Sequence, residues 1–233
     1  MGTKDTSNNN RSLNAISMID HILWSNHINS AVKNYSVIAD AINPDNLIKE
    51  KSDINFGYVE GTQCKYYGMV ESLWNSGVLK DNMKVIDLGC GLCTTLYNLN
   101  LQFKNYEIKA DFYGADHNEE LLKSVTKHLS QFWVDNELSI GSKDIMECDL
   151  SDYDLILTYL PFKKLEDVNN MYNKVFKGMK VGSVFHEHMI NGAKLVNKVE
   201  ECRQLILDNA NKHNMEEKSL LFGGEKQTIF IKR

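Results

Sequence analysis

An acid and two glycines follow an apolar run in the stretch VIDLGCGLC, where they are Asp87, Gly89 and Gly91. Glycine has no Cβ atom, so the chain can turn sharply there and a ligand can touch its backbone. The residues that follow are typical of a helix start, and the free N–H groups of a helix N-terminus carry partial positive charge. The pattern therefore predicts a strand, a ligand-binding loop and a helix, with Asp87 as a fixed negative charge.

Two classes of adenosine-containing ligand bind to such a loop. A dinucleotide requires Gly-x-Gly-x-x-Gly, and in this sequence Thr94 occupies the position of the third glycine. S-adenosylmethionine has no phosphate but carries an ammonium and a sulfonium, and an acid beside the turn suits those cations better than it suits a pyrophosphate. The loop therefore favours S-adenosylmethionine. An NAD(P)-dependent oxidoreductase and a non-catalytic S-adenosylmethionine-binding protein are the alternatives.

Apolar runs alternate with segments of helical periodicity after this loop's strand, which is the pattern of a parallel sheet covered by helices. Two apolar runs flank Gly223-Gly224 near the end of the chain and predict a β-hairpin. We expect an α/β fold with a doubly wound, mostly parallel seven-stranded sheet, a C-terminal antiparallel β-hairpin and N-terminal helices. The expected strands are 84–88, 111–116, 137–140, 153–160 and 182–188, and the expected helices lie near 62–75, 93–103, 118–131, 164–177 and 192–213. The three tryptophans fall on apolar helix faces and are expected in the core; they are Trp24, Trp74 and Trp133.

The composition limits the other classes of protein. The chain has 233 residues and a formal net charge of −5, so nucleic acid is disfavoured as its main partner. No apolar run reaches the length of a membrane span, and the polar stretch MGTKDTSNNNRS lacks the apolar segment of a signal peptide. Five scattered cysteines are typical of a reduced cytosolic protein. We therefore expect a cytoplasmic protein that does not bind membranes.

Cys90 and Cys93 form a C-x-x-C pair at the expected helix start, where thioredoxin-like proteins carry a redox-active dithiol. The acid and glycines around the pair, and the long alternation of strands and helices, fit that redox fold poorly. No second cysteine pair follows in the sequence, so no metal site is expected.

The loop resembles the first motif of the class I (seven-strand, Rossmann-like) S-adenosylmethionine-dependent methyltransferases, which is an apolar strand, an acid and Gly-x-Gly-x-Gly. VIDLGCGLC matches this motif except at Cys93, where the family has glycine. The resemblance covers roughly residues 55–233. It implies in-line methyl transfer from S-adenosylmethionine to a small-molecule or protein side-chain acceptor. We expect three parts: a disordered tail at 1–12, an N-terminal helical lid at 13–53 and a Rossmann-like methyltransferase domain at 54–233.

Later segments also resemble motifs of this family. The resemblance implies that Asp116, at the end of FYGAD, accepts the ribose hydroxyls of the cofactor. It also implies that Asp144 meets the adenine amino group and that Ile145 packs on the adenine ring. The full set of cofactor-binding residues implied in this way is Tyr58, Asp87, Gly89, Cys90, Gly91, Asp116, His117, Asp144, Ile145 and Tyr159.

The acceptor side is less well defined by the sequence. YDLILTYLPF resembles the fourth-strand motif but lacks the Asn of an Asn-Pro-Pro-aromatic motif, which argues against base or amide N-methylation. The segment before the first strand resembles lysine-directed seven-strand enzymes, and by that analogy Tyr58 and Glu60 would close over the methionine end of the cofactor. Glu60, Tyr159 and His186 are the candidate catalytic residues, which would take or orient a proton if the acceptor is an amine.

Overall fold

The structure is a computed structural model, and it describes residues 68–91, 93–119, 122–123, 126, 129–130, 133, 136–158, 162, 164–187, 198–222 and 225–233. The tail expected at 1–12 and the helical lid expected at 13–53 lie outside the described residues. The helix expected near 118–131 and the start of the one expected near 192 lie partly outside them.

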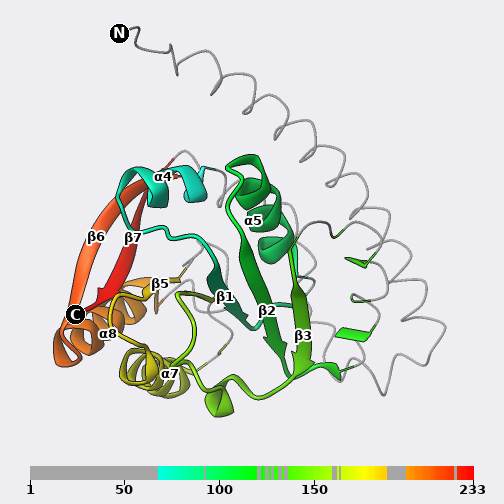
Figure 1. Ribbon diagram of the computed structural model, residues 1–233. Helices are drawn as coiled ribbons and strands as arrows, with labels where there is room; N and C mark the ends of the chain where they lie inside the picture. Colours follow the sequence, from blue (N-terminus) through cyan, green and yellow to red (C-terminus); the bar gives the residue numbers. More distant parts are fainter. Residues whose placement is uncertain are drawn as a thin grey trace, which may run out of the picture.

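One seven-stranded sheet organises the described residues, with the strand order β3-β2-β1-β4-β5-β7-β6 (Figure 1). The first five strands are parallel to their neighbours, whereas β7 is antiparallel to both β5 and β6. The strands are β1 (Met83–Leu88), β2 (Ala110–Asp116), β3 (Leu138–Ser142), β4 (Leu155–Thr158), β5 (Val184–Glu187), β6 (Met215–Phe222) and β7 (Glu225–Lys232). The expected mostly parallel seven-stranded sheet with a C-terminal antiparallel hairpin is confirmed.

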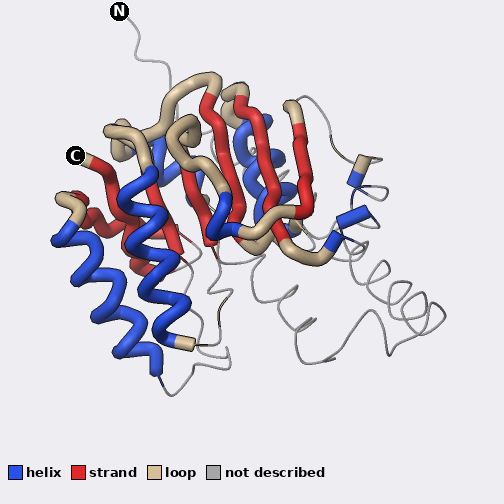
Figure 2. Tube along the Cα trace, turned by 90° about the horizontal axis from the view of Figure 1, so that it is seen from below, coloured by secondary structure: helices blue, strands red, loops and turns tan. Residues whose placement is uncertain are grey.

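Helices cover both faces of the sheet (Figure 2). On one face lie α4 (Met69–Asn75) and α5 (Thr94–Asn105), and on the other lie α7 (Leu165–Gly178) and α8 (Val199–Lys212). All four residues of β4 are buried, as expected for a central parallel strand that is covered on both sides. This double covering leaves the carboxyl ends of β1, β2 and β4 as the edge where a ligand can reach the sheet.

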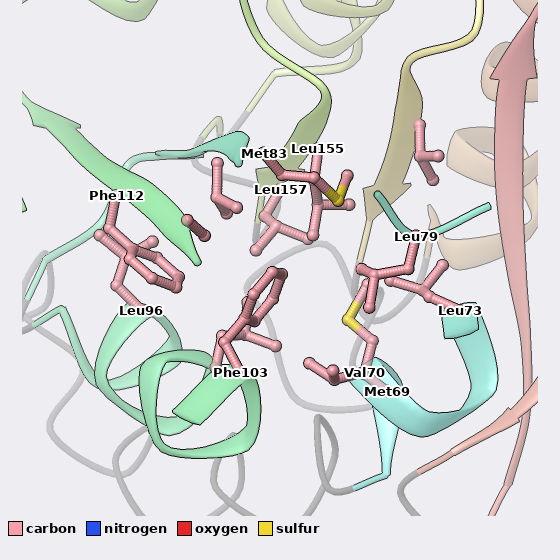
Figure 3. Packing of buried hydrophobic residues seen from close by; sticks show 14 of the residues in the cluster. Met69, Val70, Leu73, Leu79, Met83, Leu96, Phe103, Phe112, Leu155 and Leu157 are labelled. Atoms are coloured by element: carbon pink, nitrogen blue, oxygen red, sulfur yellow. The ribbon is translucent and has the colours of Figure 1, made fainter. Parts of the chain in front are cut away.

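The two buried faces explain why these segments form helices. The buried residues of α7 have the spacing of one helix face; they are Val168, Met171, Tyr172, Val175 and Phe176. Glu166 and Asp167 in the first turn stabilise the helix, because their negative charges interact favourably with the positive end of the helix dipole. Under α5, the ring of Phe103 packs edge-on against Phe112 of β2 with centroids 5.5 Å apart (Figure 3). This contact holds the C-terminal part of α5 against β2.

Trp74 corrects one expectation about the core. Its side chain is 52% exposed, because α4 buries Met69, Val70 and Leu73 and the next residue along the helix points away from that face. Trp133 is half-buried, lies against Phe112 and donates a hydrogen bond from its ring nitrogen to the Asn136 carbonyl. Trp24 lies outside the described residues.

Among the described residues, none of the helices combines the length and the apolarity that a bilayer crossing requires.

Candidate functional site

The glycine loop after β1 has the backbone conformation that its sequence predicts. Gly89 and Gly91 have positive φ angles of 79° and 48°, which glycine adopts without strain. The N–H groups of Gly89 and Cys90 both donate to the Ala115 carbonyl, at 2.7 and 3.1 Å. A Cβ atom placed on Gly91 would meet no described atom within 4 Å. The loop is therefore anchored to the end of β2, and its backbone at Gly91 remains open to a ligand.

Asp116 joins the end of β2 to the loop that follows β1. Its Oδ2 accepts a hydrogen bond from the Gly91 N–H at 3.0 Å, and its Oδ1 accepts one from the Asn118 N–H at 3.0 Å. The side chain is 11% exposed, and the exposed ring of His117 lies 3.4 Å from Oδ1. Each carboxylate oxygen has a second lone pair, so Asp116 can accept two further hydrogen bonds from a ligand.

Asp87 places a second acid beside Asp116. Its side chain is 5% exposed, and burial together with the charge of Asp116 raises the pKa of Asp87 to about 7. Two acids this close repel each other, so a cation or a hydrogen-bond donor at the loop would lower the pKa again. A ligand with a positive charge and a pair of hydroxyl groups fits these two carboxylates better than a phosphate does.

Asp144 and Ile145 lie at the end of the third strand, on the same edge of the sheet. The Lys143 N–H donates to the Asp116 carbonyl at 2.9 Å, which brings this segment next to β2. Asp144 begins the short 3-10 helix Ile145–Glu147, where its Oδ1 accepts from the Met146 N–H at 2.8 Å. The structure thus brings the loop, Asp116 and Asp144 together at adjacent strand ends, in the order that the sequence predicts.

His186 does not join this group. It is fully buried on β5, where its Nδ1 lies 2.9 Å from the Thr228 carbonyl and its ring packs edge-on against Phe222 at 5.1 Å. Desolvation by burial lowers the pKa of His186 to about 4, so the ring is neutral near pH 7. This placement packs His186 against the C-terminal hairpin and gives no support to its predicted catalytic role.

Glu187 is a buried acid to which the sequence analysis gave no role. It pairs in register with Thr158, whose hydroxyl donates to the Leu88 carbonyl at 3.0 Å, so the ends of β1, β4 and β5 lie in a row. Burial raises the pKa of Glu187 to about 8, and the facing Tyr172 hydroxyl offsets part of that shift. No hydrogen bond of regular geometry joins the two groups within the described residues. The strand period signals this placement, because the neighbour of His186 must face the other side of the sheet.

Gly114 is a second residue that the sequence analysis did not single out. A Cβ atom on this residue of β2 would lie 2.8 Å from the Cys90 Sγ and 3.3 Å from Leu96 Cδ1. The absent side chain therefore leaves the space in which Cys90 of the glycine loop packs against β2.

Three of the predicted site residues lie outside the described residues, and their roles stay predictions. They are Tyr58, Glu60 and Tyr159.

Two curated proteins are similar to part of this chain. The carboxy-S-adenosyl-L-methionine synthase of Campylobacter fetus is 31% identical to this chain over 150 residues, which is 61% of this chain and 58% of that protein. The sterol 24-C-methyltransferase erg6 of Aspergillus fumigatus is 24% identical over 109 residues, which is 46% of this chain and 28% of that protein. The chain spans 28% to 58% of the length of the curated relatives it matches.

The fold is also similar to a solved structure, the magnesium protoporphyrin IX methyltransferase from Synechocystis with bound SAH. The two share a TM-score of 0.50 at 14% identity, over 78% of this chain and 86% of the other. A family model described as "Methyltransferase domain" matches residues 79–226, which include every strand and helix described here except α4 and most of β7. The chain therefore belongs to the methyltransferase domain family.

Proposed function

We propose that this chain binds S-adenosylmethionine at the ends of β1, β2 and β3 and transfers its methyl group to a small-molecule or protein side-chain acceptor by in-line displacement. The observation that carries the proposal is the Asp116 carboxylate, held by the Gly91 N–H at 3.0 Å beside the buried Asp87. The family match supports it, since it covers all three of these residues.

Each residue of the site has a defined part in this proposal. Asp116 accepts the ribose hydroxyls with its free lone pairs, and Asp87 supplies negative charge for the cationic methionine end. The backbone of Gly89, Cys90 and Gly91 lies against the ligand. Asp144 accepts from the adenine amino group, Ile145 packs on the ring, and His117 lies at the exposed rim.

S-adenosylmethionine, when bound, supplies a methyl group that is already electrophilic on a sulfonium. The chain therefore needs to orient the acceptor and exclude water more than it needs acid–base catalysis. Tyr58, Glu60 and Tyr159 are the residues we expect at the acceptor end. The small-molecule class of acceptor is the first candidate and a protein side chain is the second.

A second candidate function follows from the 31% identity to a carboxy-S-adenosyl-L-methionine synthase. In this case the chain would change S-adenosylmethionine itself and transfer no methyl group. The two candidates differ in product, because methyl transfer yields S-adenosylhomocysteine and synthesis yields a heavier derivative. Mass spectrometry of the nucleoside products after incubation with S-adenosylmethionine and a metabolite mixture separates them.

The test of cofactor binding is titration calorimetry with S-adenosylmethionine, S-adenosylhomocysteine, NAD and NADP. We expect the first two to bind and the last two to give no heat. Asp116→Ala removes two ligand hydrogen bonds to a charged group, each worth roughly 1.5 to 3 kcal/mol, so binding should weaken at least tenfold. Asp208→Ala, on the exposed face of α8, is the matched control and should bind normally. Binding of NAD alone would overturn the proposal.

A further inference from the structure

Cys90 and Cys93 lie at the two ends of one tight turn in the glycine loop. The Cys93 N–H donates to the Cys90 carbonyl at 2.7 Å, which is the bond that closes a β-turn. The Cα atoms at the ends of a β-turn are within about 7 Å, and a disulfide needs Cα atoms roughly 4.4 to 6.8 Å apart. The Cys93 Sγ lies 4.0 Å from the Gly91 carbonyl oxygen, within the same turn. The backbone therefore already holds this pair at a separation that a disulfide can bridge.

The other described cysteines are placed differently. Cys148 and Cys202 are free thiols in the apolar cluster on the α7 and α8 face of the sheet, whereas Cys90 and Cys93 belong to the cluster on the α4 and α5 face. A Cys90–Cys93 bond would close inside the loop that carries Gly91, and so inside the proposed cofactor site.

We propose that Cys90 and Cys93 form a redox-active dithiol, which a peroxide oxidises to a disulfide that weakens cofactor binding. In the first step one thiolate attacks a peroxide oxygen, and a sulfenic acid and water form. The second thiol then displaces water from the sulfenic acid, so the sulfur–sulfur bond forms. Two protons and two electrons leave the pair, and one hydrogen peroxide becomes two waters. The effect on the cofactor rests on the proposed function, whereas the formation of the disulfide does not.

The loss of binding follows from the geometry of the loop. A disulfide brings the two sulfur atoms to about 2.05 Å, much closer than two thiols that are not bonded to each other. The Cys90 Sγ must then leave its place against Gly114, and the turn that contains Gly91 must shift with it. The Gly91 N–H bond to Asp116 is 3.0 Å long, so a small shift of this turn misplaces the carboxylate that the proposal assigns to the ribose.

The surroundings of the pair predict when it reacts. Cys90 is 6% exposed and Cys93 is fully buried. The neighbouring Cys93 thiol, burial, and the charges of Asp87 and Asp116 all raise the pKa of Cys90 well above its usual range. The thiolate is the reactive form, so oxidation should be slow at neutral pH and faster as the pH rises. A bound cofactor would cover the loop and slow oxidation further.

The experiment treats the full reduced chain with hydrogen peroxide at pH 7 and pH 9, and blocks the remaining thiols by alkylation. Trypsin cleavage after Lys84 and Lys104 gives one peptide, 85–104, that contains both cysteines. We expect this peptide to lose two hydrogens and to escape alkylation, faster at pH 9 and more slowly with S-adenosylhomocysteine present. Calorimetry with S-adenosylhomocysteine should then show at least tenfold weaker binding, reversed by a phosphine reductant.

Two variants complete the test. Cys93→Ser keeps a residue suited to the helix N-cap and should bind S-adenosylhomocysteine equally before and after peroxide, whereas the control Cys148→Ser should respond like the wild type. An alkylated, unbridged peptide under excess peroxide overturns the proposal, and so does a bridged peptide with unchanged affinity. A bridged peptide in a chain that never binds S-adenosylhomocysteine overturns the proposed function and the effect on the cofactor, and leaves the dithiol established.

Discussion

The Asp116 carboxylate accepts a hydrogen bond from the Gly91 N–H at 3.0 Å, and this bond ties the end of β2 to the loop that follows β1. It spans 25 residues of sequence and holds the two parts of the proposed cofactor site in one fixed geometry. The second oxygen of Asp116 holds the Asn118 N–H, so the carboxylate cannot rotate without breaking both bonds. The site is therefore preorganised by the backbone amides that surround it.

Asp116→Asn tests this preorganisation apart from charge. One amide oxygen replaces two carboxylate oxygens, so either the Gly91 N–H or the Asn118 N–H loses its acceptor. We expect the free energy of unfolding to fall by about 1 to 3 kcal/mol, as for a partly buried donor left unsatisfied. Urea denaturation measures it. Asp208→Asn, on the surface of α8, should stay within about 0.5 kcal/mol of the wild type. An Asp116→Asn variant as stable as the wild type would contradict the role of the two hydrogen bonds.

Because the pKa of Asp87 is raised, we expect the affinity for S-adenosylmethionine to depend on pH. Its pKa of about 7 means that it is half protonated at neutral pH, and only the ionised form attracts a cation. A bound cation lowers this pKa, so the observed dissociation constant should rise by up to about tenfold per pH unit as the pH falls below 7. Titration calorimetry between pH 5.5 and 7.5 measures the slope.

The control for this prediction is Asp87→Asn, which resembles the protonated acid. Its affinity should match that of the wild type near pH 5.5 and should change little up to pH 7.5. Equal slopes in the two proteins would show that another group is responsible for the pH dependence.

Gly114→Ala tests the packing between β2 and the glycine loop. The new Cβ would lie 2.8 Å from the Cys90 Sγ, so we expect a loss of about 1 to 3 kcal/mol of stability, as for other overpacked sites. In a Cys90→Ala background the obstructing sulfur is gone, and the same substitution should cost clearly less. The double-mutant cycle, measured by urea denaturation, isolates this contact. Gly141→Ala is the matched control, since its Cβ would meet no described atom within 4 Å. Equal costs in both backgrounds would rule out the Cys90 contact as the cause.

The sequence predicts the parts of this molecule that depend on neighbouring residues. The alternation of apolar runs gives the parallel sheet, and the acid-glycine spacing locates the loop, because both patterns are set within a few residues. The sequence also predicts Asp116 at the end of a strand, and that strand, β2, pairs with β1. The family follows from these local patterns together.

Local sequence patterns do not predict contacts between segments that are distant in the sequence. Trp74 lies on a short helix whose buried face is set by β6 and α5, and the sequence does not show that this face stops at Leu73. The contact between Cys90 and Gly114 joins the loop after β1 to the neighbouring strand β2. His186 and Glu187 are neighbours in sequence but pack on opposite faces, His186 against the hairpin and Glu187 against Tyr172. Only the tertiary structure shows that His186 meets residues of the hairpin and that Glu187 meets α7.

Because the pKa of Glu187 is raised in the folded chain, we expect the free energy of unfolding to fall as the pH rises. Its pKa is about 8 in the folded chain against 4.5 for an exposed glutamate, so the folded state holds a proton that the unfolded state has already lost. Stability from this group is fully present below pH 4.5 and falls as the pH rises toward 8. Asp87 has the same sign and is half titrated at pH 7, and His186 has the opposite sign between about pH 4 and 6.5, so Glu187 makes the largest of these three contributions between pH 7 and 8.

We expect the free energy of unfolding of the wild type to fall by about 1 kcal/mol between pH 7 and pH 8, from the linkage of one proton. Glu187→Gln keeps the shape of the side chain without the titrating proton, so its stability should fall clearly less than that of the wild type in this interval. Urea denaturation at both pH values measures the difference, with Glu147→Gln on an exposed turn as the control that keeps the wild-type slope. A Glu187→Gln variant that loses stability as steeply as the wild type would mean that Glu187 is already ionised in the folded protein.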